Sequence, residues 1–195
     1  MSPQHELILG GARSGKSRAA EQRAAHWLQA GGGYRATLVA TAWGPQWTGD
    51  LEMGERIARH RADRAARLAR LETVECALHL GATLRALDDP RRLIVVDCLT
   101  LWLTQCLMPP PAPAGVTPPQ ADWASEQAGL FDALRASRSP IVLVSNEIGL
   151  GVTPLAPQAR ACVDALGRLH QDLAACCARV TLMVAGCALP VKGQP

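Results

Sequence analysis

The chain has 195 residues, 48% of them hydrophobic, and its formal net charge at pH 7 is +3. This length and composition allow one substantial buried core, so we expect a single domain spanning residues 1–195. The small net charge gives no reason to expect a nucleic-acid partner. No apolar run approaches the roughly 20 residues that span a bilayer, and the first residues lack a signal-peptide pattern, so we expect a cytoplasmic protein without a membrane span.

Seven cysteines occur at positions 76, 98, 106, 162, 176, 177 and 187. Their number is odd, no C-x-x-C pair is present, and most of them lie in apolar segments. Structural thiols in a reducing compartment are therefore favoured, with disulfides or metal ligation as the alternative.

A glycine-rich segment follows a short apolar strand at residues 7–9. Its residues are Gly10, Gly11, Ala12, Arg13, Ser14, Gly15, Lys16 and Ser17. They match the phosphate-binding pattern G-x-x-x-x-G-K-[ST] at every fixed position. The two outer glycines let backbone N–H groups turn toward a phosphate, and the helix that begins near Lys16 adds the positive end of its dipole. We expect Lys16 to contact the β- and γ-phosphates of a nucleotide and Ser17 to supply an oxygen ligand to Mg²⁺.

The next segments continue an alternation of helix and strand. Strong helix formers fill residues 16–29 and end at three glycines, and a short apolar strand follows at 37–41. The loop at 42–50 contains Trp43 and Trp47. These two side chains could stack on a ligand or contact a second subunit, and ordinary packing is an equally good explanation.

Residues 51–70 form a predicted helix that is rich in arginine. A solvated helix face is the simplest interpretation of this charge. If the helix instead faces the phosphate loop, its arginines offer bidentate phosphate contacts around a single imidazole. The residues in question are Arg56, Arg59, Arg61 and Arg64, around His60.

A second candidate ligand for Mg²⁺, an acidic residue, follows a buried strand. After a strand at 71–75 and a helix at 76–87, residues 92–97 form a continuous apolar run that ends in Asp97. Such a run is typical of a strand in the middle of a parallel sheet. Although the pattern is common by chance, its pairing with the phosphate loop predicts that Asp97 completes the Mg²⁺ site, directly or through water.

The rest of the chain completes an α/β pattern. An apolar helix at 98–108 precedes a proline-rich exposed loop at 109–120, and then a helix at 121–137, a strand at 141–144, a helix at 158–177 and a strand at 180–185 follow. Residues 189–192 predict an antiparallel edge strand, where Pro190 is tolerated. The whole pattern predicts a P-loop NTPase fold of the RecA-like type, a three-layer sandwich whose sheet is mostly parallel.

Several later segments occur in a characteristic order. They are Asp97–Thr104, Val144–Pro154, Gly167–Ala174 and Met183–Gly186. Together with Gly10–Ser17 and the pattern Arg56-Ile57-x-x-His60-x-x-x-Arg64, they resemble the bifunctional adenosylcobinamide kinase/adenosylcobinamide-phosphate guanylyltransferase family of cobalamin biosynthesis. The resemblance covers most of the chain. Its most specific parts are the phosphate loop and Asn146-Glu147-x-Gly149-x-Gly151.

This resemblance implies an enzyme with two reactions. A nucleoside triphosphate, ATP or GTP, phosphorylates the hydroxyl of the aminopropanol arm of adenosylcobinamide. GTP then donates GMP to that phosphate through a guanylylated histidine, for which His60 fits the family pattern. Arg56 and Arg64 become candidates for charge stabilisation, and Glu147 for contacting the nucleotide or activating the acceptor hydroxyl. The family also suggests a homo-oligomer, for which a trimer is our expectation.

The sequence departs from the family pattern at four positions. His170 stands where asparagine is expected, Val163 where arginine is expected, Gln105 where asparagine is expected and Ala65 where proline is expected. None of them belongs to the phosphate loop, and none is His60 or Asp97. His170 is a second candidate for a reactive imidazole, ranked below His60.

Two other classes of function stay open from sequence. One is a different small-molecule P-loop kinase without nucleotidyl transfer, in which His60 has no chemical role. The other is a nucleotide-responsive binding protein, whose basic helix and proline-rich loop would contact a partner. Labelling by GTP carrying a labelled α-phosphate distinguishes the transferase from both.

Overall fold

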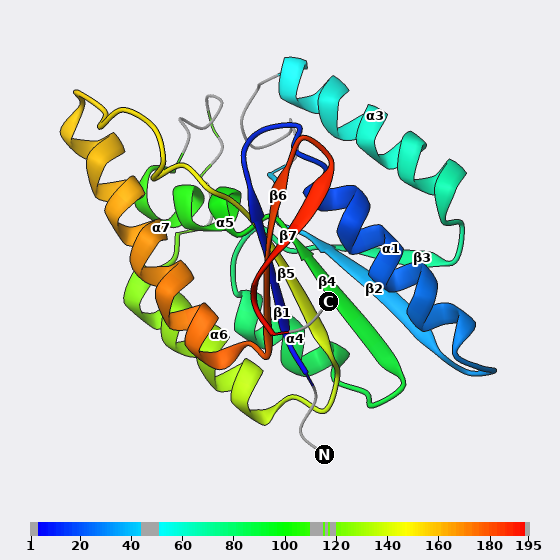
Figure 1. Cartoon of the computed structure of the whole chain (residues 1–195). Helices are drawn as coiled ribbons and strands as arrows, with labels where there is room; N and C mark the ends of the chain where they lie inside the picture. The colour runs from blue at the N-terminus through cyan, green and yellow to red at the C-terminus, as the bar shows by residue number, and fades with distance from the viewer. Residues whose placement is uncertain (1–3, 44–50, 110–114, 116, 118–119, 194–195) are drawn as a thin grey trace.

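The computed structural model describes residues 4–43, 51–109, 115, 117 and 120–193, apart from the side chains of residues 53, 56, 60 and 65. A seven-stranded sheet in the order β3-β2-β4-β5-β1-β6-β7 forms its centre (Figure 1). The strands are β1 (Glu6–Gly10), β2 (Arg35–Ala40), β3 (Leu71–Glu75), β4 (Arg92–Asp97), β5 (Ile141–Asn146), β6 (Arg179–Val184) and β7 (Cys187–Lys192). Neighbouring strands pair in parallel except β6 and β7, which pair antiparallel.

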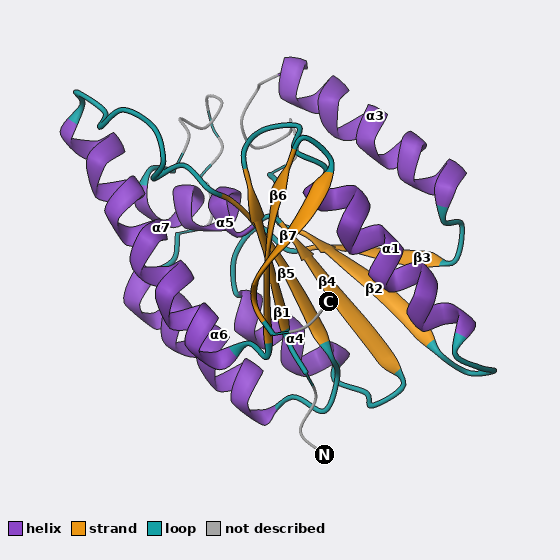
Figure 2. Ribbon diagram, viewed as in Figure 1, coloured by secondary structure: helices purple, strands orange, loops and turns teal. Residues whose placement is uncertain are grey.

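Helices cover both faces of this sheet (Figure 2). On one side lie α1 (Lys16–Gln29) and α3 (Leu51–Arg67). On the other lie α4 (Leu80–Leu87), α5 (Leu99–Leu107), α6 (Trp123–Ala136) and α7 (Pro157–Cys176). The predicted α/β class, the mostly parallel sheet and the antiparallel edge strand are therefore confirmed.

Two hydrophobic clusters, one on each face, hold the layers together. Along β4, Ile94 and Val96 belong to the cluster beneath α4–α7, whereas Leu93 and Val95 belong to the cluster beneath α1. Because side chains alternate between the faces of a strand, a strand buried on both faces needs a continuous apolar run. This explains why the sequence of β4 predicts its central position correctly.

The start of α4 differs from the expectation of a helix over residues 76–87. The helix begins only at Leu80, because His79 adopts a left-handed φ of 59° just before it. Glu126 of α6 supplies the missing cap, since its carboxylate accepts hydrogen bonds from Leu80 N at 3.3 Å and from the buried Trp102 indole at 3.2 Å. The cap comes from a distant element, so the local pattern could not indicate it.

The two unusual loops of the sequence are only partly described. Trp43 is 4% exposed, so it packs inside the protein, whereas Trp47 lies outside the described residues. In the proline-rich stretch, the described residues Pro109, Gly115, Thr117 and Gln120 are exposed, as expected. No helix among the described residues is long and apolar enough to cross a membrane.

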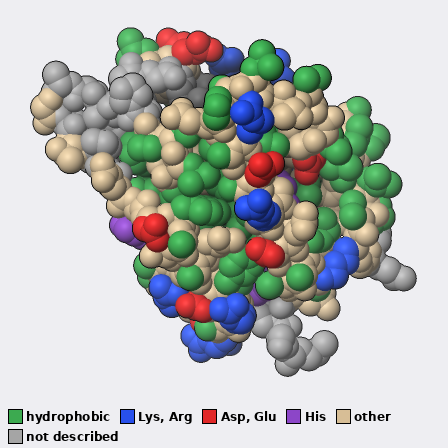
Figure 3. Space-filling view, turned by 90° about the vertical axis from the view of Figure 1, so that its left-hand side faces the viewer, with side chains coloured by type: hydrophobic (Ala, Val, Ile, Leu, Met, Phe, Trp, Pro, Cys, Tyr) green, Lys and Arg blue, Asp and Glu red, His purple; other side chains and the backbone are tan. Residues whose placement is uncertain are grey.

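The face that carries α7 mixes acidic, basic and hydrophobic side chains (Figure 3). Exposed apolar side chains are prominent in the loop between β5 and α7, where Leu150, Val152 and Leu155 are more than four-fifths exposed. This loop follows Glu147, so it borders the carboxyl edge of the sheet, where the candidate site residues lie.

Candidate active site

The phosphate loop joins β1 to α1 and is shaped by its glycines. Gly10 and Gly15 have φ values of 152° and 100°, which side chains rarely adopt. A Cβ at position 10 would lie 2.5 Å from Met183 O and 2.6 Å from Ser14 Oγ. The turn after β6 supports the loop from outside, because Gly186 N donates to Ser14 O at 3.0 Å. The loop is therefore built against β6, with Gly11, Ala12 and Arg13 exposed to a ligand.

Lys16 lies at the first position of α1 and is 8% exposed. Its ammonium group donates to Gly11 O at 2.6 Å, inside the curve of the loop. Burial lowers the pKa of Lys16, and the nearby Cys98 and Asp97 oppose this effect. A phosphate entering the loop would meet this charge, and the predicted contact of Lys16 with the β- and γ-phosphates stays a prediction.

Ser17 and Asp97 meet as the sequence predicts. Ser17 Oγ donates to Asp97 Oδ2 at 3.3 Å, although the two residues belong to α1 and to the end of β4. The contact follows from the topology, because only β5 separates β4 from β1 and all three strands are parallel. A hydroxyl and a carboxylate beside a phosphate loop are the oxygen donors that Mg²⁺ takes, so these two residues fit the expected metal.

Thr41, which belongs to no motif of the sequence, fixes the backbone beside Asp97. Its hydroxyl donates to Cys98 O at 2.7 Å and accepts from Cys98 N at 2.8 Å. Gln105 of α5 donates in turn to Thr41 O at 2.9 Å. Threonine at the end of a strand is too common a pattern to reveal this role before the fold is known.

Glu147 also lies at this edge. Its backbone N donates to Gly10 O at 3.0 Å, which places the residue directly beside the start of the phosphate loop. One carboxylate oxygen, Oε1, accepts from Gly149 N at 2.7 Å. The other, Oε2, lies 3.6 Å from Nδ1 of His170, and the Glu147 side chain is 21% exposed. Glu147 therefore lies beside the phosphate loop, and its role toward the nucleotide or the acceptor hydroxyl stays a prediction.

His170 is buried in α7 behind Glu147. Its side chain is 8% exposed, and its Nε2 lies 2.8 Å from Ser145 Oγ. Burial lowers the pKa of His170, while the Glu147 carboxylate acts in the opposite direction. Both ring nitrogens face protein groups, so the structure offers no support for His170 as a second nucleophile.

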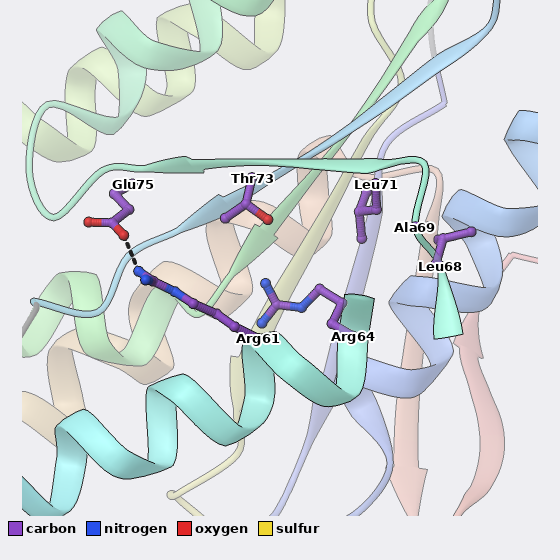
Figure 4. Close-up of a pocket in the computed structure, with 7 residues that line it drawn as sticks. All are labelled: Arg61, Arg64, Leu68, Ala69, Leu71, Thr73 and Glu75. Atoms are coloured by element: carbon purple, nitrogen blue, oxygen red, sulfur yellow. Dashed lines mark hydrogen bonds and ion pairs between the residues drawn. The ribbon is translucent and has the colours of Figure 1, made fainter. Parts of the chain in front are cut away.

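The basic helix α3 packs beside α1 through ion pairs. Arg67 makes two hydrogen bonds to the Glu21 carboxylate, at 2.8 and 3.0 Å, and Arg64 Nε lies 3.9 Å from the same carboxylate. Arg61 and Arg64 extend from α3 toward β3 and line a groove of about 360 Å³, where Arg61 pairs with Glu75 (Figure 4). Glu21 follows Ser17 by four residues in α1, so the contact with Glu21 places Arg64 about one helical turn from Ser17.

The side chains of Arg56 and His60 lie outside the described residues, so only their backbone positions are known. Positions 56, 60 and 64 are each four residues apart in α3 and therefore lie on one stripe of the helix. Arg64, on this stripe, faces α1. In Figure 1, α3 begins at the end of the molecule where β1 meets the phosphate loop.

These features define a P-loop nucleotide-binding protein with a hydroxyl and a carboxylate in contact beside its phosphate loop. The fold is similar to that of the flagellar accessory protein FlaH from Methanocaldococcus jannaschii, with a TM-score of 0.52, 13% identity and coverage of 99% of this chain and 80% of that one. Residues 6–191 match the family model described as cobinamide kinase/cobinamide phosphate guanyltransferase, and the chain belongs to this family.

Curated relatives match almost the whole chain. The bifunctional adenosylcobalamin biosynthesis protein CobP of Pseudomonas aeruginosa is 46% identical over 190 residues, which are 97% of this chain and 98% of the relative. The bifunctional adenosylcobalamin biosynthesis protein CobU of Salmonella typhimurium is 34% identical over 194 residues, with 95% and 98% coverage. The resemblance noted in the sequence is therefore confirmed at the level of the family.

Proposed function

We propose that this chain catalyses both reactions of its family, phosphorylation of adenosylcobinamide and GMP transfer from GTP to the resulting phosphate. The product is adenosylcobinamide-GDP, and the setting is cobalamin biosynthesis in the cytoplasm. The observation that carries this proposal is the phosphate loop with Lys16 inside its curve and Ser17 within 3.3 Å of Asp97. Family membership supplies the substrate class.

In the kinase step, the hydroxyl oxygen of the aminopropanol arm attacks the γ-phosphorus of ATP or GTP. The bond from the γ-phosphorus to the bridging oxygen breaks, and the nucleoside diphosphate leaves. Glu147 accepts the hydroxyl proton, while Lys16 and the loop amides hold the phosphates. Ser17 and Asp97 would hold Mg²⁺, which when bound neutralises negative charge on the phosphate oxygens.

In the transfer step, a neutral His60 imidazole attacks the α-phosphorus of GTP and releases pyrophosphate. The phosphate of adenosylcobinamide phosphate then attacks the same phosphorus and restores the free imidazole. Arg56 and Arg64 stabilise the charge of the phosphates. Support comes from the position of residue 60, which lies one helical turn from Arg64 on the same stripe of α3. Arg64 itself faces α1.

Labelling with GTP that carries a labelled α-phosphate tests the transfer step. We expect the full chain to form an acid-labile GMP adduct, and His60→Ala to form none while keeping kinase activity. His26→Ala, an exposed histidine of α1, is the matched control and should label normally. An adduct of normal yield on His60→Ala would contradict the assignment of the nucleophile. Absence of turnover with cobinamide and GTP would favour a nucleotide-responsive binding protein.

Calorimetric titration with GTP tests the phosphate loop separately. We expect Lys16→Ala to abolish tight binding, because it removes the cation inside the loop. Arg18→Ala removes one positive charge from an exposed position two residues away and should bind GTP as the unaltered chain does. Equal affinity of the Lys16 variant and the unaltered chain would rule out this mode of nucleotide binding.

We also propose a homo-oligomer, with a trimer as the expected state. Its support is the family resemblance. Light scattering of the purified chain measures the mass directly, and a mass equal to the 20.7 kDa of one chain would contradict the proposal.

A further inference from the structure

A partly buried hydrogen-bonded chain runs from α5 through β5 to α7. Asn146 N donates to Thr100 Oγ1 at 2.9 Å, Thr100 Oγ1 lies 3.1 Å from Ser145 Oγ, and Ser145 Oγ lies 2.8 Å from His170 Nε2. The chain ends where His170 Nδ1 faces Glu147 Oε2 at 3.6 Å. It therefore connects the interior of the protein to the carboxylate beside the loop.

We propose that His170 is a positioning residue for the kinase step, which directs an N–H at the Glu147 carboxylate and holds it beside the phosphate loop as an ionised base. This inference rests on the proposed role of Glu147 as the group that accepts the hydroxyl proton. His170 itself touches neither nucleotide nor acceptor in this assignment. Its effect passes through the orientation of one side chain.

The Glu147 carboxylate, which can only accept a hydrogen bond, assigns the tautomer of His170. The backbone N–H of Asn146 can only donate, so Thr100 Oγ1 accepts from it. Since the carboxylate oxygen that faces Nδ1 cannot donate, a neutral imidazole places its proton on Nδ1, and Ser145 then donates to Nε2. A neutral imidazole that accepts at Nε2 carries its proton on Nδ1, which is the nitrogen that faces Glu147.

Both oxygens of Glu147 are then restrained. Gly149 N donates to Oε1 at 2.7 Å, and His170 Nδ1–H is directed at Oε2. Burial keeps the pKa of His170 below its ordinary value, so the imidazole stays neutral near pH 7 despite the carboxylate. A neutral donor orients the carboxylate without the full ion pair that would weaken its ability to accept a proton.

Two substitutions of His170 distinguish the contribution of Nδ1 from that of Nε2. Asparagine places its amide nitrogen near the position of Nδ1, whereas glutamine places its amide near Nε2. His170→Asn therefore keeps a donor toward Glu147, and His170→Gln keeps only the contact with Ser145. Kinase turnover of cobinamide by the full chain, measured as kcat and KM, is the readout, and GMP labelling reports whether the rest of the site is intact.

We expect His170→Gln to lower kcat of the kinase step roughly tenfold or more, within the range that a positioned general base contributes. Its KM for cobinamide and its GMP labelling should change less than about twofold, because positioning of a base affects the chemical step. His170→Asn should recover most of the lost rate. Equal losses in both variants, or loss of labelling together with kcat, would indicate a structural role and overturn the proposal.

Glu147→Gln distinguishes this inference from the function on which it rests. If Glu147→Gln keeps the kinase rate, the proposed role of Glu147 is wrong and the role of His170 falls with it. If Glu147→Gln loses the rate and His170→Gln keeps it, only the positioning role is wrong. Loss in both, with recovery in His170→Asn, supports the complete proposal.

Discussion

Replacement of Gly10 by alanine should destabilise the protein and the phosphate loop together. The new Cβ would lie 2.5 Å from the backbone oxygen of Met183 in β6, which cannot move without disturbing the sheet. Overpacking of this kind costs about 1–3 kcal/mol, and the φ of 152° adds strain of about 1–3 kcal/mol for a residue with a side chain. Alanine also lowers the conformational entropy of the unfolded chain, which offsets the loss of stability by less than about 1 kcal/mol. We therefore expect the free energy of unfolding to fall by about 2–5 kcal/mol.

Urea unfolding, followed by tryptophan fluorescence at 25 °C, measures this loss. Gly11→Ala is the matched control, because a Cβ at that position meets nothing within 4 Å. It should change the free energy of unfolding by less than about 0.5 kcal/mol, as surface substitutions usually do. A Gly10→Ala protein as stable as Gly11→Ala would refute the reasoning, because β6 and the loop could not then be in such close contact.

Three further predictions concern packing and charge. Gly81→Ala should destabilise the protein by about 1–3 kcal/mol, because its Cβ would lie 2.2 Å from Gly129 O. Gly129→Ala, whose Cβ meets nothing within 4 Å, should instead stabilise it by up to about 1 kcal/mol. Urea unfolding measures both changes. Burial raises the pKa of Asp88, but hydrogen bonds from Arg138, Ser139 and Ser137 outweigh it and lower the pKa to about 2, below the unfolded value of 3.8. Asp88→Asn should therefore lower the free energy of unfolding by up to about 2 kcal/mol at pH 7. This difference should disappear as the pH falls from about 4 to about 2 in an acid titration, and a constant difference would contradict it. Glu21→Gln should weaken the ion pairs with α3 by about 1 kcal/mol and slow GMP labelling, whereas Glu75→Gln, at an exposed pair, should change labelling less.

The sequence predicts the framework of the fold because its signals there are local. The apolar run of β4, the alanines of α1 and Pro190 in the edge strand each restrict what their own segment can form. The same holds for the phosphate loop, where every required residue lies within eight positions. Ser17 and Asp97 could be paired in advance only because the carboxyl ends of parallel strands meet at one edge of the sheet.

Long-range contacts account for what the sequence could not predict. Thr41 fixes the backbone of Cys98, Glu126 caps α4, and His170 faces Glu147, and each contact joins elements that are distant in the chain. The sequence shows that position 170 departs from the family pattern and carries a histidine. Its buried position, which gives no support to a role as a second nucleophile, depends on the packing of α7 against β5.

The two proposed reactions depend on different kinds of structural support. Of the groups assigned to the γ-phosphate, Lys16 begins helix α1 and Glu147 follows strand β5, and both elements contribute residues to the hydrophobic clusters. By contrast, the described residues of α3 include none that is buried, and the helix meets α1 through the carboxylate of Glu21. Ion pairs at a surface contribute much less than a packed core. The position of His60 should therefore respond to charge changes that leave the phosphate loop intact, which is why GMP labelling and kinase turnover must be measured separately in every variant.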